Sequence, residues 1–269
     1  MSVCPKCKEG YILSGEPTGS VLADFHGAYL SPGPSSTPSR QAVLLLTDAF
    51  GMSLPNPKIM ADQLAKKLDC DVWVPDYFAG KPIIPASKLQ LPDRSGIKTS
   101  FWSYVKLFFI LIPQIPAFIS NRPSVINARL ASLIQLLKEN KKYEKIGTVG
   151  YCYGGAACIR LGKTGLVDSV IIAHPGGFTI DDVKAIKVPA SWICAEEDHY
   201  FQEDKRLQCE AIFASRKDKP DYVDYEFRLY KDTAHGFASR PNLNLPEIKE
   251  AWEGAFQQTV DWFKKTLTV

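Results

Sequence analysis

The sequence of 269 residues contains no uncharged apolar run long enough to cross a bilayer, and its charge is nearly balanced. The most apolar stretch, 107–119, is too short for a transmembrane helix and contains two prolines, so we expect no membrane span. The net charge is +3, with lysine and arginine scattered among acidic residues, and we therefore expect no nucleic-acid binding. The first residues show no basic segment followed by an apolar run, so no secretory signal is expected.

The cysteine pattern contains no disulfide framework and no complete zinc site. Seven cysteines is an odd number, and several of them, such as Cys158 and Cys194, lie in apolar stretches, which is typical of reduced intracellular proteins. Cys4 and Cys7 have the spacing of half a zinc ribbon or of a redox pair, but no second C-x-x-C completes a four-ligand site. We expect a cytoplasmic protein without metal or cofactor, and the purpose of the Cys4/Cys7 pair stays open.

From residue 42 onward, short apolar runs alternate with helical patterns, which is the signature of βαβ units. The predicted strands cover 42–47, 71–75, 145–150, 168–174, 189–195 and 223–230, and the predicted helices cover 56–68, 124–138, 154–161, 203–215 and 247–267. The sequence therefore predicts a single α/β domain over 1–269, with a mostly parallel central sheet and helices on both faces. Within the N-terminal extension, 1–40, we expect a leading antiparallel hairpin with a strand at 21–30 and its loop at 31–39.

The apolar stretch 107–119 allows two interpretations. Short apolar runs are usually core, so a buried helix and turn are favoured over a lid or a membrane-surface segment. In the alternative, the stretch and Trp102 lie near the mouth of a substrate pocket.

The strongest chemical signal is the segment from Gly150 to Gly154, which lies between a predicted strand and a predicted helix. It matches the nucleophile elbow G-x-S-x-G of α/β-hydrolases, with Cys152 in place of serine. Glycines two positions before and after the nucleophile allow a strand to turn abruptly into a helix. The helix N-terminus then favours a thiolate at Cys152, and the N–H of Tyr153 is available to a developing oxyanion.

An acid and a base follow the nucleophile in the order that this fold uses, each after a later strand. Asp198 follows the predicted strand 189–195, and His235 follows the strand 223–230. We expect His235 to take the proton of Cys152, and Asp198 to orient the imidazole and stabilise its charge. A simpler interpretation treats Asp198 as a helix N-cap and His235 as a surface histidine.

Five segments together resemble the motif series of the dienelactone hydrolase family: Thr47-DAFG, Val74-PDYFAG, Gly150-YCYGG, Ala195-EEDH and Ala234-HGFA. The resemblance runs from about residue 42 to the C-terminus, and the N-terminal C-x-x-C is similar to that of fungal members. It implies an α/β-hydrolase fold and a triad of Cys152, Asp198 and His235. In this family such a triad hydrolyses an enol lactone through a thiol-acyl intermediate.

The loop after the first core strand departs from the family pattern. The resemblance implies a glutamate that contacts the resting thiol, and this sequence has Asp48 instead. Asp48 is either the acid that contacts the thiol, reaching one methylene less, or a turn-forming residue. The same loop is expected to supply the second oxyanion N–H, for which Ala49 is the candidate.

Four further residues are candidates for substrate binding. The resemblance implies an arginine that holds a substrate carboxylate, and Arg240 follows the triad histidine closely, although a solvated surface arginine is the alternative. His174 ends a strand on the side where active-site loops gather, with a histidine satisfied by backbone as the safer interpretation. Tyr77, within one of the motifs, and Trp102 complete the set.

The leading hypothesis is a hydrolase of small esters or lactones, of the dienelactone (carboxymethylenebutenolidase) type, acting through an acyl-cysteine at Cys152. A thioesterase or acyl transferase using the same triad is one alternative. A non-enzymatic scaffold in which Cys152 is a redox-responsive thiol is the other. The expected partner is a small-molecule substrate, and the sequence leaves monomer and homodimer open.

Overall fold

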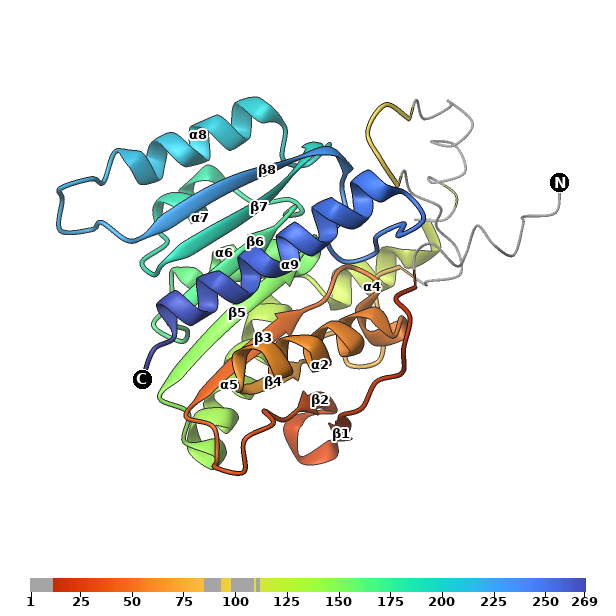
Figure 1. Cartoon of the computed structure of the whole chain (residues 1–269), viewed down its shortest axis with the longest axis vertical. Coiled ribbons are helices and arrows are strands. Elements are labelled where there is room, and N and C mark those ends of the chain that lie inside the picture. Colours follow the sequence, from red (N-terminus) through yellow and green to blue (C-terminus); the bar gives the residue numbers. More distant parts are fainter. Residues whose placement is uncertain (1–11, 85–92, 98–108, 110–111) are drawn as a thin grey trace, which may run out of the picture.

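The computed structural model describes residues 12–84, 93–97, 109 and 112–269. Its centre is an eight-stranded sheet in the order β1-β2-β4-β3-β5-β6-β7-β8 (Figure 1). β2 pairs antiparallel with both β1 and β4, and all other neighbours are parallel. The strands are β1 (Ser20–Leu22), β2 (Ala28–Ser31), β3 (Gln41–Leu46), β4 (Asp71–Val74), β5 (Lys145–Tyr151), β6 (Ser169–Ala173), β7 (Ala190–Glu197) and β8 (Tyr225–Ala234).

Helices cover both faces of the sheet. The α-helices are α2 (Asn56–Leu68), α4 (Ile115–Ser120), α5 (Pro123–Lys141), α6 (Tyr153–Gly162), α7 (Ile180–Lys184), α8 (Glu203–Ala214) and α9 (Pro246–Thr266), and the short 3-10 helices are η1 (Ala23–Phe25), η2 (Gly51–Ser53) and η4 (Ile112–Gln114). No helix in the described ranges combines the length and apolar character needed to cross a membrane.

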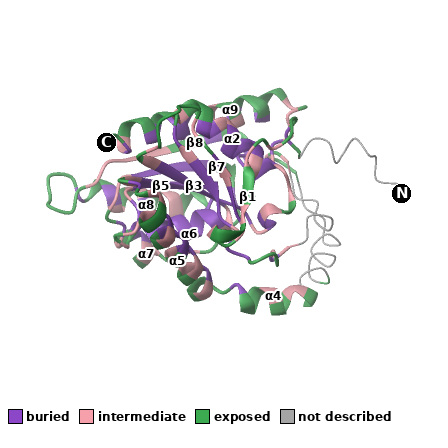
Figure 2. Ribbon diagram, turned by 90° about the horizontal axis from the view of Figure 1, so that it is seen from below, coloured by how far each residue is buried: buried purple, intermediate pink, exposed green. Residues whose placement is uncertain are grey.

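The sheet separates two apolar cores. Side chains alternate along β3, so Leu44 and Leu46 point to one face while Val43 and Leu45 point to the other. α5, α6 and α8 cover the first core, and α2 and α9 cover the second (Figure 1). The central strands are therefore buried on both faces (Figure 2), which explains their continuous apolar runs.

The α/β prediction from residue 42 onward is confirmed. α2 has the bounds predicted for the helix 56–68, and β8 continues past residue 230 to Ala234. The short helix α7 was missed by the sequence analysis, although a local signal exists. Thr179 accepts a hydrogen bond from the N–H of Asp182 at 3.1 Å and so caps the helix N-terminus.

The predicted N-terminal hairpin exists, but its turn was placed wrongly. The strand predicted at 21–30 is two strands, β1 and β2, and the chain reverses between them at His26 (φ 56°) and Gly27 (φ 74°). Left-handed conformations of this kind end a strand. The segment 31–39, predicted as the hairpin loop, instead connects β2 to β3. It bonds to the turn between α2 and β4, where the N–H of Ser35 donates to Asp69 Oδ1 at 3.0 Å.

The favoured interpretation of 107–119 as buried core is wrong for its described part. Phe109 is 67% exposed, and α4 has no buried residue. Within the described residues 112–120, which contain Pro113 and Pro116, the chain forms only the 3-10 turn η4 and the short helix α4, and neither presents a long apolar face to the sheet.

Asp62 of α2 fixes the segment that leads into the hairpin. Asp62 Oδ1 accepts a hydrogen bond from the Tyr29 hydroxyl at 2.8 Å, and Asp62 Oδ2 accepts one from the N–H of Thr18 at 2.7 Å. Burial and the bond to Asp62 raise the pKa of Tyr29 to about 12, so its hydroxyl stays a donor.

We predict that Asp62→Ala lowers the free energy of unfolding by about 2 to 3 kcal/mol, because two donors lose their buried acceptor. Urea denaturation followed by circular dichroism measures the change. The matched control is Asp24→Ala, which removes an exposed carboxylate from the same hairpin and is expected to cost less than about 0.5 kcal/mol. Equal effects of the two substitutions would contradict this assignment.

Candidate active site

The turn from β5 into α6 holds Cys152 in a strained backbone conformation, with φ 53° and ψ −109°. A Cβ on Gly150 would lie 2.1 Å from Gly154 O, and a Cβ on Gly154 would lie 2.3 Å from Leu46 O. Neither position can accept a side chain, which is the physical reason for the two glycines around the nucleophile. The turn presents Cys152 at the N-terminus of α6, half-buried and with a free thiol.

Backbone hydrogen bonds hold this turn between the loops after β3 and β6. The N–H of Cys152 donates to Ala173 O at 3.1 Å, and Gly154 donates to Thr47 O at 3.1 Å. In the described part of the chain, the N–H groups of Tyr153 and Ala49 have no acceptor. Both are therefore free to bind an oxyanion, as the sequence analysis proposed for them.

The pairing of β7 with β8 brings the predicted acid and base together. Glu197 pairs with Ala234 beyond an irregularity in the two strands, so the next residues, Asp198 and His235, are neighbours. His235 Nδ1 lies 2.8 Å from Asp198 Oδ2. Asp198 is 5% exposed, and its Oδ1 accepts a hydrogen bond from the N–H of Tyr200 at 2.8 Å. One carboxylate oxygen thus fixes the following turn while the other holds the imidazole.

His235 lies between Asp198 and the thiol. Burial by itself lowers the pKa of His235, but the charge of Cys152 and the hydrogen bond to Asp198 outweigh it and raise the pKa to about 10. The enclosed Nε2 atom faces Cys152 in a geometry looser than a regular hydrogen bond, which is common before substrate binds. The arrangement therefore favours a protonated imidazole at His235, facing the sulfur of Cys152. The structure brings Cys152, Asp198 and His235 together as predicted for a triad.

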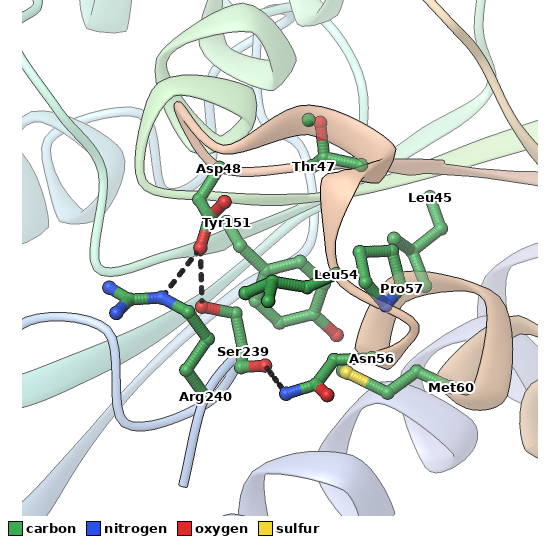
Figure 3. A pocket seen from close by; sticks show the side chains of 11 residues that line it. Leu45, Thr47, Asp48, Leu54, Asn56, Pro57, Met60, Tyr151, Ser239 and Arg240 are labelled. Carbon is green, nitrogen blue, oxygen red and sulfur yellow. Dashed lines mark hydrogen bonds and ion pairs between the residues drawn. The ribbon is translucent and has the colours of Figure 1, made fainter. Parts of the chain in front are cut away.

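Asp48 does not occupy the place expected of an acid that contacts the thiol. Its Oδ1 accepts a hydrogen bond from the N–H of Phe50 at 3.0 Å. Its Oδ2 accepts from Arg240 Nε at 2.9 Å and from Ser239 Oγ at 3.2 Å (Figure 3). Among the described residues it has no hydrogen bond to Cys152. The expected contact of Asp48 with the thiol is therefore wrong. Its side chain forms an ion pair with Arg240, and its bond to the N–H of Phe50 supports the alternative of a turn-forming residue.

Arg240 is accordingly not the solvated surface arginine of the simpler interpretation. Its side chain is 11% exposed and its guanidinium lies 4.5 Å from the ring centre of Phe50. The cavity in Figure 3, which the Asp48–Arg240 pair borders, is enclosed by Leu45, Met60 and Tyr151 and is too small for an organic substrate.

His174 lies next to His235. Its ring is fully buried, and its centre lies 5.1 Å from that of His235. Neither ring nitrogen has a hydrogen bond of regular geometry within the described ranges. Burial, followed by the charges of His235 and Arg240, holds the pKa of His174 well below its usual value. The His174 ring is therefore neutral. It packs against the ring of His235 and does not line an open pocket.

Of the two aromatic residues predicted to bind substrate, Tyr77 and Trp102, only Tyr77 lies in the described part of the chain. Tyr77 is buried, and its hydroxyl donates to Thr47 O at 2.5 Å and accepts from Thr47 Oγ1 at 3.2 Å. It therefore supports the loop that carries Ala49 and does not face a substrate. Trp102 lies outside the described residues.

Tyr200 is a site residue that the sequence analysis missed. Its ring centre lies 5.2 Å from that of His235, and the side chain is 56% exposed. Partial desolvation of the phenol, followed by the charges of Cys152 and Asp198, raises the pKa of Tyr200. Its place two positions after Asp198 was a usable signal, because the residues that follow a candidate acid lie close to the same site. No group of three or more histidine, cysteine or acidic side chains suited to a metal ion occurs within the described ranges.

The sequence of this chain is similar to those of known proteins. The family model described as "Dienelactone hydrolase family" matches residues 27–267. "Hydrolase pyvD" of Aspergillus violaceofuscus is 32% identical, over 97% of this chain and 96% of that protein. "Hydrolase tropI" of Talaromyces stipitatus is 29% identical over 96% and 94%, and the mouse "Carboxymethylenebutenolidase homolog" is 26% identical over 97% and 96%.

Solved structures show the same fold. A putative dienelactone hydrolase from Klebsiella pneumoniae superposes with a TM-score of 0.64 at 12% identity, covering 88% of this chain and 92% of that one. The dienelactone hydrolase-like promiscuous phosphotriesterase P91, from metagenomic libraries, gives a TM-score of 0.62 at 18% identity, over 89% and 92%. With a family match over most of its length, this chain belongs to the dienelactone hydrolase family and is a carboxylic-ester hydrolase.

Proposed function

We propose that this protein hydrolyses a small ester or lactone of the dienelactone type through an acyl-enzyme on Cys152. The observation that carries the proposal is the contact of 2.8 Å between His235 and Asp198, with the imidazole facing a thiol held at the nucleophile elbow. The names of the relatives, among them carboxymethylenebutenolidase homologues, support a lactone as the substrate.

Acylation begins when the Cys152 thiolate attacks the carbonyl carbon. The oxyanion that forms is stabilised by the N–H groups of Tyr153 and Ala49, at the positive end of α6. The tetrahedral intermediate collapses, the C–O bond breaks, and the His235 imidazolium gives its proton to the leaving oxygen. For a lactone the leaving oxygen stays attached to the acyl group, so the ring opens on the enzyme.

Deacylation uses the same groups in reverse. Neutral His235 takes a proton from water, the resulting hydroxide attacks the thioester, and the carboxylic acid leaves as the Cys152 thiolate is restored. Asp198 stabilises the imidazolium formed in each half-reaction. The free state of all cysteines in the described ranges supports a reducing compartment, and we propose the cytoplasm.

A first prediction concerns the acyl-enzyme itself. Incubation with 4-nitrophenyl acetate is expected to add one acetyl group, seen by intact mass, and Cys152→Ala is expected to abolish the adduct and reduce kcat by at least about 10³. Cys209→Ala, which changes a buried cysteine in α8, is the matched control and is expected to keep both. Persistence of the adduct in Cys152→Ala would show that another residue is the nucleophile.

A second prediction follows from the causes of the raised pKa of His235. Cys152→Ala removes a negative charge and a hydrogen-bond partner, while burial and Asp198 remain, so the pKa of His235 is expected to fall from about 10. NMR titration of the side chains measures it, and the four histidines of the chain make assignment practical. Asp198→Asn is expected to move the pKa in the same direction. An unchanged pKa in Cys152→Ala would mean that no thiolate lies beside the imidazole.

A further inference from the structure

Asn121 lies between α4 and α5 and is only 1% exposed, although α4 itself has no buried residue. Its Nδ2 atom donates to Lys81 O at 2.9 Å, and its main-chain oxygen accepts from the Tyr153 hydroxyl at 2.5 Å. Its Oδ1 atom accepts from Arg129 Nη1 at 2.9 Å, and the same Nη1 atom donates to Tyr77 O at 2.9 Å. A buried amide with partners in three separate segments fixes those segments relative to one another.

Tyr153 connects this amide to the nucleophile. It follows Cys152 directly, and its N–H is one of the two donors of the oxyanion hole. Its ring packs against Phe78 with 5.5 Å between the ring centres, and its hydroxyl reaches Asn121. Partial burial raises the pKa of Tyr153, so the hydroxyl stays protonated and remains a donor. The side chain is therefore held both at its ring and at its hydroxyl.

The loop after β4, residues 75–84, connects the same amide to the second donor. Asn121 binds this loop at Lys81, and three residues later the N–H of Ile84 donates to Ala49 O at 3.1 Å. The oxygen of Ala49 is thus fixed by the loop, while its N–H has no acceptor in the described part of the chain. A series of contacts therefore runs from one oxyanion donor to the other through Asn121.

We infer that Asn121 is a positioning residue, which joins Tyr153 to the loop 75–84 and thereby fixes the distance between the Tyr153 and Ala49 N–H groups. Its burial keeps it from touching the substrate, so it acts through these two residues. The two donors lie on different elements, and a shared oxyanion is bound well only when both point at the same place. The assignment rests on the proposed function.

Tyr153→Phe tests the connection by removing one hydroxyl, while it keeps the ring and the N–H. With 4-nitrophenyl acetate, kcat is expected to fall about 10- to 100-fold with little change in KM, because a displaced donor affects the oxyanion more than the bound ester. Asn121→Ala is expected to act in the same direction, and the double variant is expected to be no slower than the slower single variant.

The matched control is Tyr222→Phe, which removes the hydroxyl of a tyrosine that is 46% exposed and bonded to Asp224 at 3.4 Å. It is expected to leave kcat unchanged. A wild-type kcat in Tyr153→Phe would overturn the inference.

A trifluoromethyl alkyl ketone reports on the oxyanion hole without turnover. The Cys152 sulfur adds to the ketone carbon, and the carbonyl electron pair moves to the oxygen, which then needs the same two donors. In Tyr153→Phe and in Asn121→Ala, the inhibition constant is expected to rise by the factor by which kcat/KM falls. An inhibition constant that stays at the wild-type value while kcat/KM falls would contradict the positioning role.

Alkylation by iodoacetamide distinguishes a displaced donor from general damage. That reaction forms no oxyanion, so both variants are expected to keep the wild-type alkylation rate of Cys152 while they lose acylation. Loss of both rates together would overturn the inference and indicate collapse of the site. If the wild type itself acquires no acyl group from the ester, the proposed function fails, and this assignment fails with it.

Discussion

The elbow at residues 150–154 depends on close backbone contacts among the end of β3, the end of β5 and the start of α6, which the two glycines Gly150 and Gly154 permit. Gly150 and Gly154 let backbone atoms approach to distances that any Cβ would forbid, and Cys152 is consequently held at a positive φ. The rest of the site depends on this contact. It places the sulfur at the N-terminus of α6, leaves the Tyr153 N–H unpaired, and ties the elbow to the loop of Ala49 through Thr47 O.

A second constraint is the register of the last two parallel strands. The pairing of Glu197 with Ala234 makes Asp198 and His235 adjacent, although 37 positions separate them in the chain. The neutral ring of His174 then fills the space behind His235, so the imidazole has a carboxylate on one side, the thiol on the other and a buried ring behind it. The ion pair of His235 with Asp198 is largely shielded from water, and electrostatic stabilisation is more effective in such surroundings.

The parts of this site that could be predicted from the sequence are those set by chain order and local spacing. The elbow glycines, and the positions of Asp198 and His235 after successive strands, follow from backbone topology, which apolar runs reveal. The partner of Asp48 could not be predicted, because it depends on which of several polar groups lies across a gap between two loops. Whether it reaches the thiol or Arg240 is decided by one methylene and by the turn that Gly236 permits.

Two predictions about the fold were wrong, the position of the N-terminal hairpin turn and the burial of the stretch 107–119. The hairpin turn was misplaced because the segment 31–39, with three prolines, gives a stronger turn signal than the single glycine, Gly27, at the actual reversal. The stretch 107–119 was expected in the core on composition alone. Its described part is exposed because prolines shorten the helix that burial would need.

The central claim is that ester cleavage passes through one acyl-enzyme on Cys152. Partitioning tests it most directly, using two esters with the same acyl group and different leaving groups, hydrolysed in the presence of hydroxylamine. Because the leaving group has departed before water or hydroxylamine attacks, the account predicts the same ratio of hydroxamate to acid from both esters. A ratio that changes with the leaving group would show that water attacks the ester itself, and would contradict the account.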